Sequence, residues 1–277
     1  MNPDGKAALD GRTAIVTGGS RSIGRGIALA LARAGADVVV NYKTNRDAAE
    51  QVVKEIEASG RKALAFQADV ADYDRVKEMT TAAVDAFGKV DILVCNAGIL
   101  HRNVEVFEVD LDAFHQMIDT HIMGAFHCIQ AVLPVMRRQP RGDIHLLSST
   151  HTIGLPRGLL SYNVAKAGLE ALAQCLAKEE RGNDIRVNVI APTTTESDMA
   201  SGLLQRVGLS SFREMDQYMP FGRVVQPRDI ANLCVYLASE EGSHISGQVI
   251  AVDASQGKKA TIDFLPQQDQ QRQRRGI

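Results

Sequence analysis

Two kinds of apolar pattern alternate along most of the chain. Short runs of β-branched residues predict buried strands, and longer segments with apolar residues every three to four positions predict amphipathic helices. Strands are expected at residues 13–16, 38–40, 63–67, 91–95, 144–147, 185–190 and 249–252. Helices are expected up to Ala34, at residues 46–59, 72–87, 111–138 and 228–238, and from around Tyr162 to residue 181.

The expected strands are almost continuously apolar, which is typical of a parallel sheet covered by helices on both faces. With right-handed crossovers this gives an α/β, doubly wound, Rossmann-like sheet of about seven strands. No linker-like composition divides residues 1–257, so we expect one domain there. Apolar residues at helical spacing in 193–221 predict two short helices forming a substrate lid, and 258–277 is a polar Gln/Arg-rich extension.

Composition excludes several classes of function. The formal net charge of −2 over 277 residues, without a basic stripe, argues against a nucleic-acid partner. No apolar run is long enough to cross a membrane, and residues 1–10 lack a signal-peptide core. The cysteines lie singly and without metal-ligand spacing, at positions 95, 128, 175 and 234. We therefore expect a soluble cytoplasmic protein with reduced core thiols and no metal site.

Tyr162 and Lys166 are four residues apart, so on a helix they share one face. A phenol has a pKa of about 10, and a neighbouring ammonium lowers it, which suits proton transfer to or from an alcohol oxygen. Ser149 ends an apolar run and could point into the same cleft. Tyr-x-x-x-Lys alone also occurs on ordinary helices, so the pair needs support from the rest of the chain.

A glycine-rich turn follows the first expected strand. Glycines there let the backbone approach a pyrophosphate, and the next helix supplies amide donors, although a tight strand–helix turn also favours glycine. This turn, called the phosphate turn below, has the sequence Thr17-Gly18-Gly19-Ser20-Arg21-Ser22-Ile23-Gly24.

Together these motifs resemble the short-chain dehydrogenase/reductase family, over about residues 9–257. The shared motifs, in order, are Thr17-Gly18…Gly24, Asp69-Val70, Asn96-Ala97-Gly98, Ser149, Tyr162…Lys166 and Asn188…Pro192. The resemblance implies that Ser149 holds the substrate oxygen, Tyr162 donates the proton, and Lys166 binds the nicotinamide ribose. It also implies that the phosphate turn, Asp69-Val70, the Asn96 turn, and the backbone at Pro192 and Thr195 contact the cofactor. A homotetramer or dimer is expected from the resemblance alone.

The end of the second strand bears on the choice of cofactor. A carboxylate there would bind a free 2′-hydroxyl and repel a 2′-phosphate. This chain has Asn41-Tyr42-Lys43 instead, and Arg21 in the phosphate turn. A neutral or positive pocket favours NADP(H), because guanidinium–phosphate hydrogen bonds are charge-assisted. The alternative is that Lys43 and Arg21 are solvated surface charges.

Four departures from the family pattern cluster around the expected site. Ser22 replaces a glycine, which is tolerable at negative φ but strained at positive φ. His121 stands where the family has an asparagine, and is either a partial replacement that adds pH dependence or an inert packed residue. Thr193 replaces the glycine after Pro192, and Ala254-Ser255 replace a Gly-Gly pair.

The expected function is interconversion of a ketone and a secondary alcohol, with most resemblance to 3-oxoacyl-thioester and polyketide or naphthol reductases. Alternatives are dehydration, epimerisation or cyclisation on the same fold, or a cofactor-binding sensor. The apolar lid suggests a partly apolar substrate. Further polar contacts could come from His101, Arg102, His151, Thr152 and Arg157. Arg137, Arg138 and Arg141 either complement a helix dipole or form a docking patch for an acyl carrier protein.

Overall fold

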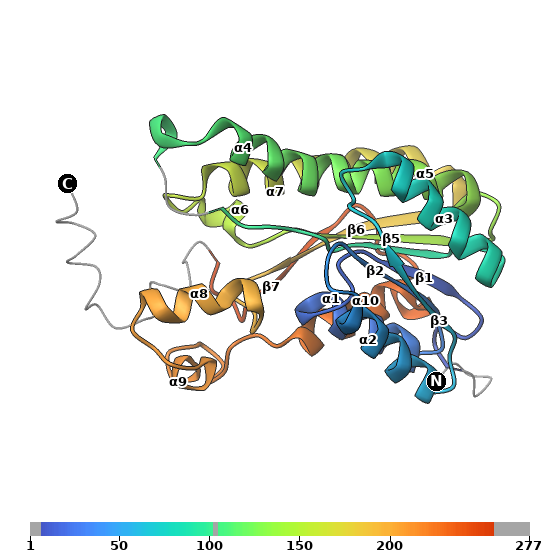
Figure 1. Cartoon of the computed structure of the whole chain (residues 1–277), viewed down its shortest axis with the longest axis horizontal. Helices are drawn as coiled ribbons and strands as arrows, with labels where there is room; N and C mark the ends of the chain where they lie inside the picture. Colours follow the sequence, from blue (N-terminus) through green and yellow to red (C-terminus); the bar gives the residue numbers. More distant parts are fainter. Residues whose placement is uncertain (1–6, 102–104, 258–277) are drawn as a thin grey trace.

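A single seven-stranded sheet forms the centre of the molecule (Figure 1), in a computed structural model that describes residues 7–101 and 105–257. Every neighbouring pair of strands is parallel, and the spatial order is β3-β2-β1-β4-β5-β6-β7. The predicted doubly wound fold is confirmed. The strands are β1 (Thr13–Val16), β2 (Asp37–Tyr42), β3 (Ala63–Gln67), β4 (Ile92–Cys95), β5 (Gly142–Leu147), β6 (Ile185–Pro192) and β7 (Val249–Val252).

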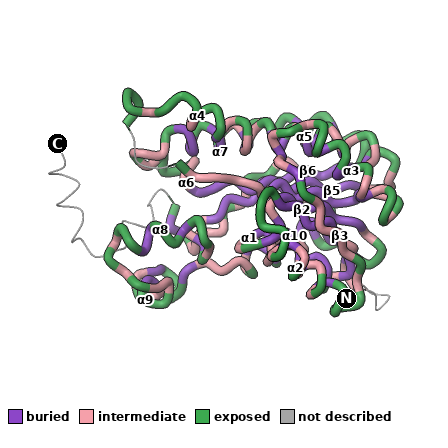
Figure 2. The backbone as a smooth tube through the Cα atoms, in the orientation of Figure 1, coloured by how far each residue is buried: buried purple, intermediate pink, exposed green. Residues whose placement is uncertain are grey.

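Helices cover both faces of the sheet, and the strands between them are buried (Figures 1 and 2). One face carries α1 (Ser22–Arg33), α2 (Arg46–Ala58) and α10 (Pro227–Ala238). The other carries α3 (Tyr73–Phe87), α5 (Gly124–Met136) and α7 (Leu160–Glu180). The helix starts follow ordinary capping chemistry: Asn45 and Asp72 accept hydrogen bonds from backbone amides in the first turns of α2 and α3.

Short helical turns join these layers: α6 (His151–Gly154), and the 3₁₀ turns η1 (Val106–Glu108), η3 (Arg181–Asn183) and η4 (Glu240–Gly242). Cys95, Cys128 and Cys234 are buried, whereas Cys175 is exposed, so it is not the core thiol that the sequence suggested. Within the described ranges, no helix combines the length and apolar character needed to span a bilayer.

The helix expected at residues 111–138 is interrupted by a wider turn. It consists of α4 (Leu111–Ile118), a π-helical turn η2 (Asp119–Met123) and then α5, which ends ahead of Pro140. A π turn inserts one extra residue and re-aims the side chains around it, and such turns are frequent at functional sites. The apolar periodicity predicts the helix but not this irregularity.

Two short helices follow β6, as the apolar spacing predicted. They are α8 (Asp198–Arg206) and α9 (Phe212–Asp216), and Figure 1 shows them as a pair to one side of the main helical layers. Leu203 and Leu204 of α8 and Met215 of α9 form a separate small core with Met219 and Val224, which follow α9. The segment therefore has an apolar core of its own beside the sheet.

A buried group of charges occupies the amino-terminal edge of the sheet. The Asp143 carboxylate, on β5, lies 2.6 Å from Arg12 and 2.6 Å from Arg186, and Arg12 also donates to the backbone oxygens of Asp91 and Ala238. Burial raises the pKa of Asp143 above its ordinary value, although the two guanidinium groups oppose this. The cluster connects β1, β5, β6 and the end of α10.

Removing this carboxylate is expected to be costly, because two guanidinium groups would lose their partner in the interior. We predict that Asp143→Ala lowers the free energy of unfolding by about 3–5 kcal/mol, measured by urea denaturation. Glu50→Ala, which breaks the exposed pair with Arg46 on α2, should lower the free energy of unfolding far less than Asp143→Ala does, because solvent screens that pair. Equal small losses in both variants would contradict this role for the cluster.

Candidate active site

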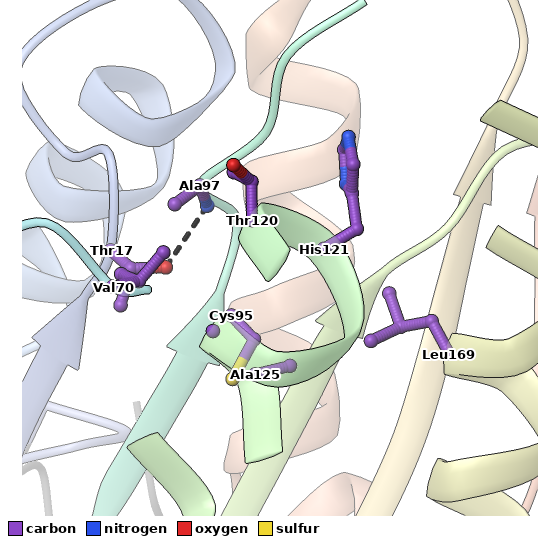
Figure 3. A pocket seen from close by; sticks show the side chains of 9 residues that line it. Thr17, Val70, Cys95, Ala97, Thr120, His121, Ala125 and Leu169 are labelled. Atoms are coloured by element: carbon purple, nitrogen blue, oxygen red, sulfur yellow. Dashed lines mark hydrogen bonds between the residues drawn. The ribbon is translucent and has the colours of Figure 1, made fainter. Parts of the chain in front are cut away.

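The ends of β1 and β4 are joined by a compact hydrogen-bond network. The Thr17 hydroxyl accepts from the amides of Asn96 (2.9 Å) and Ala97 (3.0 Å; Figure 3) and donates to Val94 O. The Asn96 side chain donates back to Thr17 O at 2.8 Å and to Gly18 O at 3.2 Å. The strand order reverses between β1 and β4, and ligands of open α/β sheets bind at such a point, beyond the carboxyl ends of the strands.

The phosphate turn has the close backbone packing that its glycines suggested. A Cβ on Gly24 would lie 2.1 Å from Gly18 O, and Gly18 itself has φ +60°. The side chain of Arg21, the N-cap residue of α1, makes no capping hydrogen bond, so the first amides of the helix are available to an anion. These features fit a pyrophosphate.

Ser22 has a positive φ of 48°, the strained one of the two backbone conformations considered for this position. Left-handed backbone costs a non-glycine residue about 1–2 kcal/mol. Its hydroxyl accepts a hydrogen bond from the Asp198 amide at 3.2 Å, and Arg21 lies 3.6 Å from the Asp198 carboxylate. The serine thus connects the phosphate turn to the start of α8. Ser20 is buried within the turn, and Ile23 packs partly against the core.

The side chains at the end of β2 face different ways. Asn41 is buried, accepting from the Gly18 amide (3.1 Å) and donating to Ala68 O (2.9 Å), and Tyr42 is buried in the core. Lys43 is exposed and lies 2.6 Å from Asp69. Burial tends to raise the pKa of Asp69, but hydrogen bonds from Lys43 and the Ala71 amide bring it below its ordinary value. Asn41 and Tyr42 therefore support the turn from inside, and of these three residues Lys43 alone places a charged group at the surface, paired with Asp69.

Sequence reasoning missed a polar hollow next to Lys43. Thr44, Asn45, Arg46 and Asp47, at the start of α2, line an open depression. The signal was available in principle, since a polar run follows the second strand.

Tyr162 and Lys166 lie on α7 and are both buried. The Lys166 ammonium donates to Leu147 O at 2.6 Å and lies 5.6 Å from the centre of the Tyr162 ring. Ser149 follows β5, and its hydroxyl contacts Pro192 O at 3.4 Å and the His151 amide at 3.3 Å. The His151 ring packs edge-on against Tyr162, so the loop carrying Ser149 reaches the tyrosine. The four side chains occupy the carboxyl edge of β5 and β6.

Burial strongly affects the Lys166 ammonium. It lowers the pKa of Lys166 to about 7, although the nearby Glu170 carboxylate raises it. Glu170 is held in place by two hydroxyls, from Ser148 at 2.6 Å and Thr152 at 2.9 Å. Thr152 is therefore engaged with Glu170, not placed on an open loop surface.

His121 is buried in the π turn, and a neutral ring fits its surroundings. Its Nε2 lies 2.8 Å from Ile99 O, and its ring meets Tyr162 edge-on with centroids 5.7 Å apart. Burial, then the Lys166 charge, lower the pKa of His121 to about 3, against the raising effect of the Ile99 hydrogen bond. Between pH 5 and 8 an uncharged ring favours the packed, inert histidine over one that adds pH dependence.

The His121 ring also limits which residue can stand at position 98. A Cβ on Gly98 would lie 2.5 Å from the His121 ring, so only glycine fits there. A cavity of about 10 Å³, near the space that one water needs, lies beside the ring and is lined by Thr17, Val70, Cys95, Ala97, Thr120, Gly124, Ala125 and Leu169 (Figure 3).

The remaining polar residues that were predicted to contact the substrate or an acyl carrier protein mostly have partners within the chain. His101 pairs with Gln116 on α4, Arg157 pairs with Glu105, and Arg102 lies outside the described residues. Arg137 is paired with Glu180, and Arg141 with Glu240. Two of the three arginines considered for a docking patch thus have carboxylate partners within the chain.

Comparison with known proteins agrees with this geometry. A family model described as "Enoyl-(Acyl carrier protein) reductase" matches residues 18–254. A 3-oxoacyl-[acyl-carrier-protein] reductase of Staphylococcus epidermidis is 42% identical over 243 residues, covering 87% of this chain and 97% of the relative. The chain belongs to the short-chain dehydrogenase/reductase family. The resemblance drawn from the sequence motifs is confirmed.

Two solved short-chain dehydrogenase/reductase structures illustrate the likeness. One from Burkholderia cenocepacia, in complex with NADP, has a TM-score of 0.79 and 32% identity, covering 91% of this chain and 100% of its own. A 7α-hydroxysteroid dehydrogenase complexed with NADH and 7-oxo glycochenodeoxycholic acid has a TM-score of 0.84 and 33% identity, covering 92% and 98%. Because their cofactors differ, membership of the family does not decide between the two nicotinamides.

The depressed pKa of Lys166 predicts how stability varies with pH. The unfolded lysine has a pKa of about 10.4, so between about pH 7 and pH 10 the unfolded state binds more protons. Stability of the unliganded protein should therefore gain a contribution that rises with pH, by up to about 1.4 kcal/mol per unit. Lys166→Met should remove this contribution in urea titrations, and the exposed Lys178→Met should retain it. Identical pH slopes in all three proteins would contradict the burial of a charged lysine.

Proposed function

We propose that this protein is an NADPH-dependent reductase that converts the ketone of a 3-oxoacyl thioester, or a related partly apolar ketone, into a secondary alcohol. The observation that carries the proposal is the buried Tyr162–Lys166 pair on α7, beside Ser149 at the carboxyl edge of the sheet. Residues 1–257 would form the catalytic domain and 193–221 its lid. The similarity to 3-oxoacyl-[acyl-carrier-protein] reductases supports the choice of substrate.

The cofactor would lie across the carboxyl ends of β1 and β4. The amides at the start of α1, with Gly18, Ser20 and Ser22, suit its pyrophosphate. Asp69-Val70 would flank the adenine, and Asn96-Ala97-Gly98 with the Pro192–Thr195 backbone would border the nicotinamide half. When bound, the nicotinamide supplies the hydride.

The 2′-phosphate is the reason to prefer NADPH. Lys43 is exposed and paired with the Asp69 carboxylate, and Arg21 is paired loosely with exposed Asp198, so both can turn towards a phosphate. No carboxylate ends β2 to repel that group. Thr44 and Arg46 border the same region.

The proton would come from Tyr162. Ser149 would donate to the substrate carbonyl oxygen, holding it beside the phenol, and Tyr162 would protonate the oxygen as the carbon is reduced. The Lys166 ammonium, held by Leu147 O, places a positive charge beside the phenol, which favours the phenolate left behind. His121, uncharged, would orient the turn against Ile99 and the Tyr162 ring without exchanging a proton.

Reduction of a carbon–carbon double bond is the second candidate. The matching family model carries an enoyl reductase description, and Ser22-Ile23 resembles the phosphate turn of such enzymes. The short Tyr162-to-Lys166 spacing and the Ser149 hydroxyl favour a carbonyl substrate instead. Dehydration, epimerisation, cyclisation and a sensing role remain alternatives without a specific supporting contact.

A homo-oligomer, a tetramer or a dimer, is also proposed. Phe126 on α5 and Val164 on α7 are each about 40% exposed, unusual for large apolar side chains on helices that flank the site. We propose a cytoplasmic enzyme, consistent with unpaired cysteines.

Loss of the Tyr162 hydroxyl tests the reaction. With NADPH and acetoacetyl thioester, Tyr162→Phe should lower kcat/KM by about 10²–10⁴-fold, because a positioned proton donor contributes about that much. Its affinity for NADPH should change little. Tyr236→Phe, on the exposed side of α10, should keep full activity. Turnover of crotonyl thioester in place of the ketone would favour the enoyl reductase, and unchanged ketone reduction by Tyr162→Phe would overturn the proposal.

A carboxylate at the end of β2 should reverse the cofactor preference. Lys43→Glu removes a cation and repels a 2′-phosphate, so the ratio of kcat/KM for NADPH over NADH should fall at least about tenfold. Lys54→Glu makes the same charge change on the exposed side of α2 and should leave the ratio unaltered. A ratio that moves equally in both variants would show a general charge effect, not a phosphate contact.

A further inference from the structure

Two of the four departures from the family pattern, three substituted residues in all, meet at one place beyond the carboxyl ends of β6 and β7. Thr193 directly follows β6, and Ala254 and Ser255 follow β7. The two segments run together, since Pro192 pairs with Val252 and the Thr193 amide donates to Val252 O at 3.2 Å. A single structural cause can therefore account for all three substitutions.

The segment after β7 is a tight turn in left-handed backbone. Ala254, Ser255 and Gly257 have φ of 50°, 64° and 60°. The Asp253 carboxylate accepts from the amides of Ser255 and Gly257, both at 3.0 Å, which holds the turn despite its unfavourable conformation. Gln256, between two exposed residues, is turned inward and is only 6% exposed.

The buried Gln256 amide reaches both ends of segment 193–221. Its oxygen accepts a hydrogen bond from the Thr193 hydroxyl at 2.6 Å, and its nitrogen lies 3.9 Å from the Met219 sulfur. Met219 belongs to the small core formed around α8 and α9. A glycine at position 193 could not make the hydroxyl contact, so the bond depends on a residue that departs from the family pattern.

The same strand end leads to the catalytic serine. Pro192 O, immediately before Thr193, accepts from the Thr150 amide at 3.1 Å and from the Ser149 hydroxyl at 3.4 Å. A shift of the Pro192–Thr193 segment would therefore move a group that contacts Ser149.

We propose that Gln256 is a positioning residue that fastens the base of the lid, holding its first and last turns in register with Ser149. The link to the ketone rests on the proposed function; the fastening of the lid does not. Breaking the Thr193–Gln256 hydrogen bond should loosen the lid and weaken ketone binding. The ends of β1 and β4 are held by the separate hydrogen bonds of Thr17 and Asn96, so the amides there should keep their protection from exchange.

The test is a double-mutant cycle on the full-length protein. Thr193→Val removes the hydroxyl and keeps the shape, Gln256→Leu removes the amide, and Thr193→Ser restores the donor. In each, amide hydrogen exchange of α8 and α9 is measured with and without NADPH, together with the KM for acetoacetyl thioester and for NADPH. Ser210→Ala is the control, because it removes a hydrogen bond to Glu214 on the exposed surface of the same segment.

Each single variant should speed lid exchange and raise the ketone KM by about five- to tenfold, the value of one hydrogen bond. Exchange in β1 and β4 should not change, Thr193→Ser should behave as wild type, and the double variant should be no worse than either single one. Additive effects, or lid exchange no faster than in Ser210→Ala, would overturn the proposal. A wild-type protein that reduces no ketone would refute the proposed function instead, and the exchange data would still decide the lid.

Discussion

The site depends first on how β1 and β4 separate. After these neighbouring parallel strands the chain turns to opposite sides of the sheet. The Thr17 hydroxyl and the Asn96 side-chain amide hold the two strand ends together through hydrogen bonds to four backbone groups. Without those hydrogen bonds the buried amides and carbonyls of both turns would lack partners, at a cost of about 1–3 kcal/mol each. The interlock fixes Gly18 against Gly24, and that close approach orients the uncapped start of α1.

A second constraint acts on the chemistry. Lys166 is a buried ammonium whose carbonyl partner, Leu147 O, comes from the end of β5, the strand that leads to Ser149. Burying a cation costs free energy, and for this reason burial lowers the pKa of Lys166. Because helix α7 also carries Tyr162, the position of the phenol is tied to the same strand end. The Tyr162 phenol, the Lys166 ammonium and the Ser149 hydroxyl are thus held by one strand–helix unit.

Much of this could be predicted from the sequence, for a physical reason. Strands buried on both faces must be continuously apolar, so all seven strands are visible as runs, and their order along the chain leaves few topologies. What the sequence did not reveal depends on contacts between distant residues. The π turn at Asp119–Met123 brings His121 to Ile99, and no local periodicity encodes that meeting.

The sequence also did not show in which direction individual side chains point. Asn41 and Tyr42 were predicted to contact the cofactor. In the structure both are buried, because β2 has covering layers on both sides, and Asn41 accepts a hydrogen bond from the Gly18 amide of the phosphate turn. The substitutions at Ser22, Thr193 and Ala254-Ser255 appeared to be separate mild changes. In the structure Ser22 joins the phosphate turn to α8, and the others form one unit around Gln256. The sequence pattern identifies the positions that differ from the family, but only the contacts in the structure show which of these positions act together.

The central claim is that Tyr162 and Ser149 face the reacting carbonyl beside a nicotinamide. The most direct measurement is a crystal structure of Tyr162→Phe with NADPH and acetoacetyl thioester, in which turnover should be too slow to consume the ketone. We predict the ketone oxygen within hydrogen-bond distance of the Ser149 hydroxyl, next to the edge of the substituted ring, with the nicotinamide facing the carbonyl carbon. A ketone bound away from Ser149, or a nicotinamide outside the β1–β4 junction, would contradict the account.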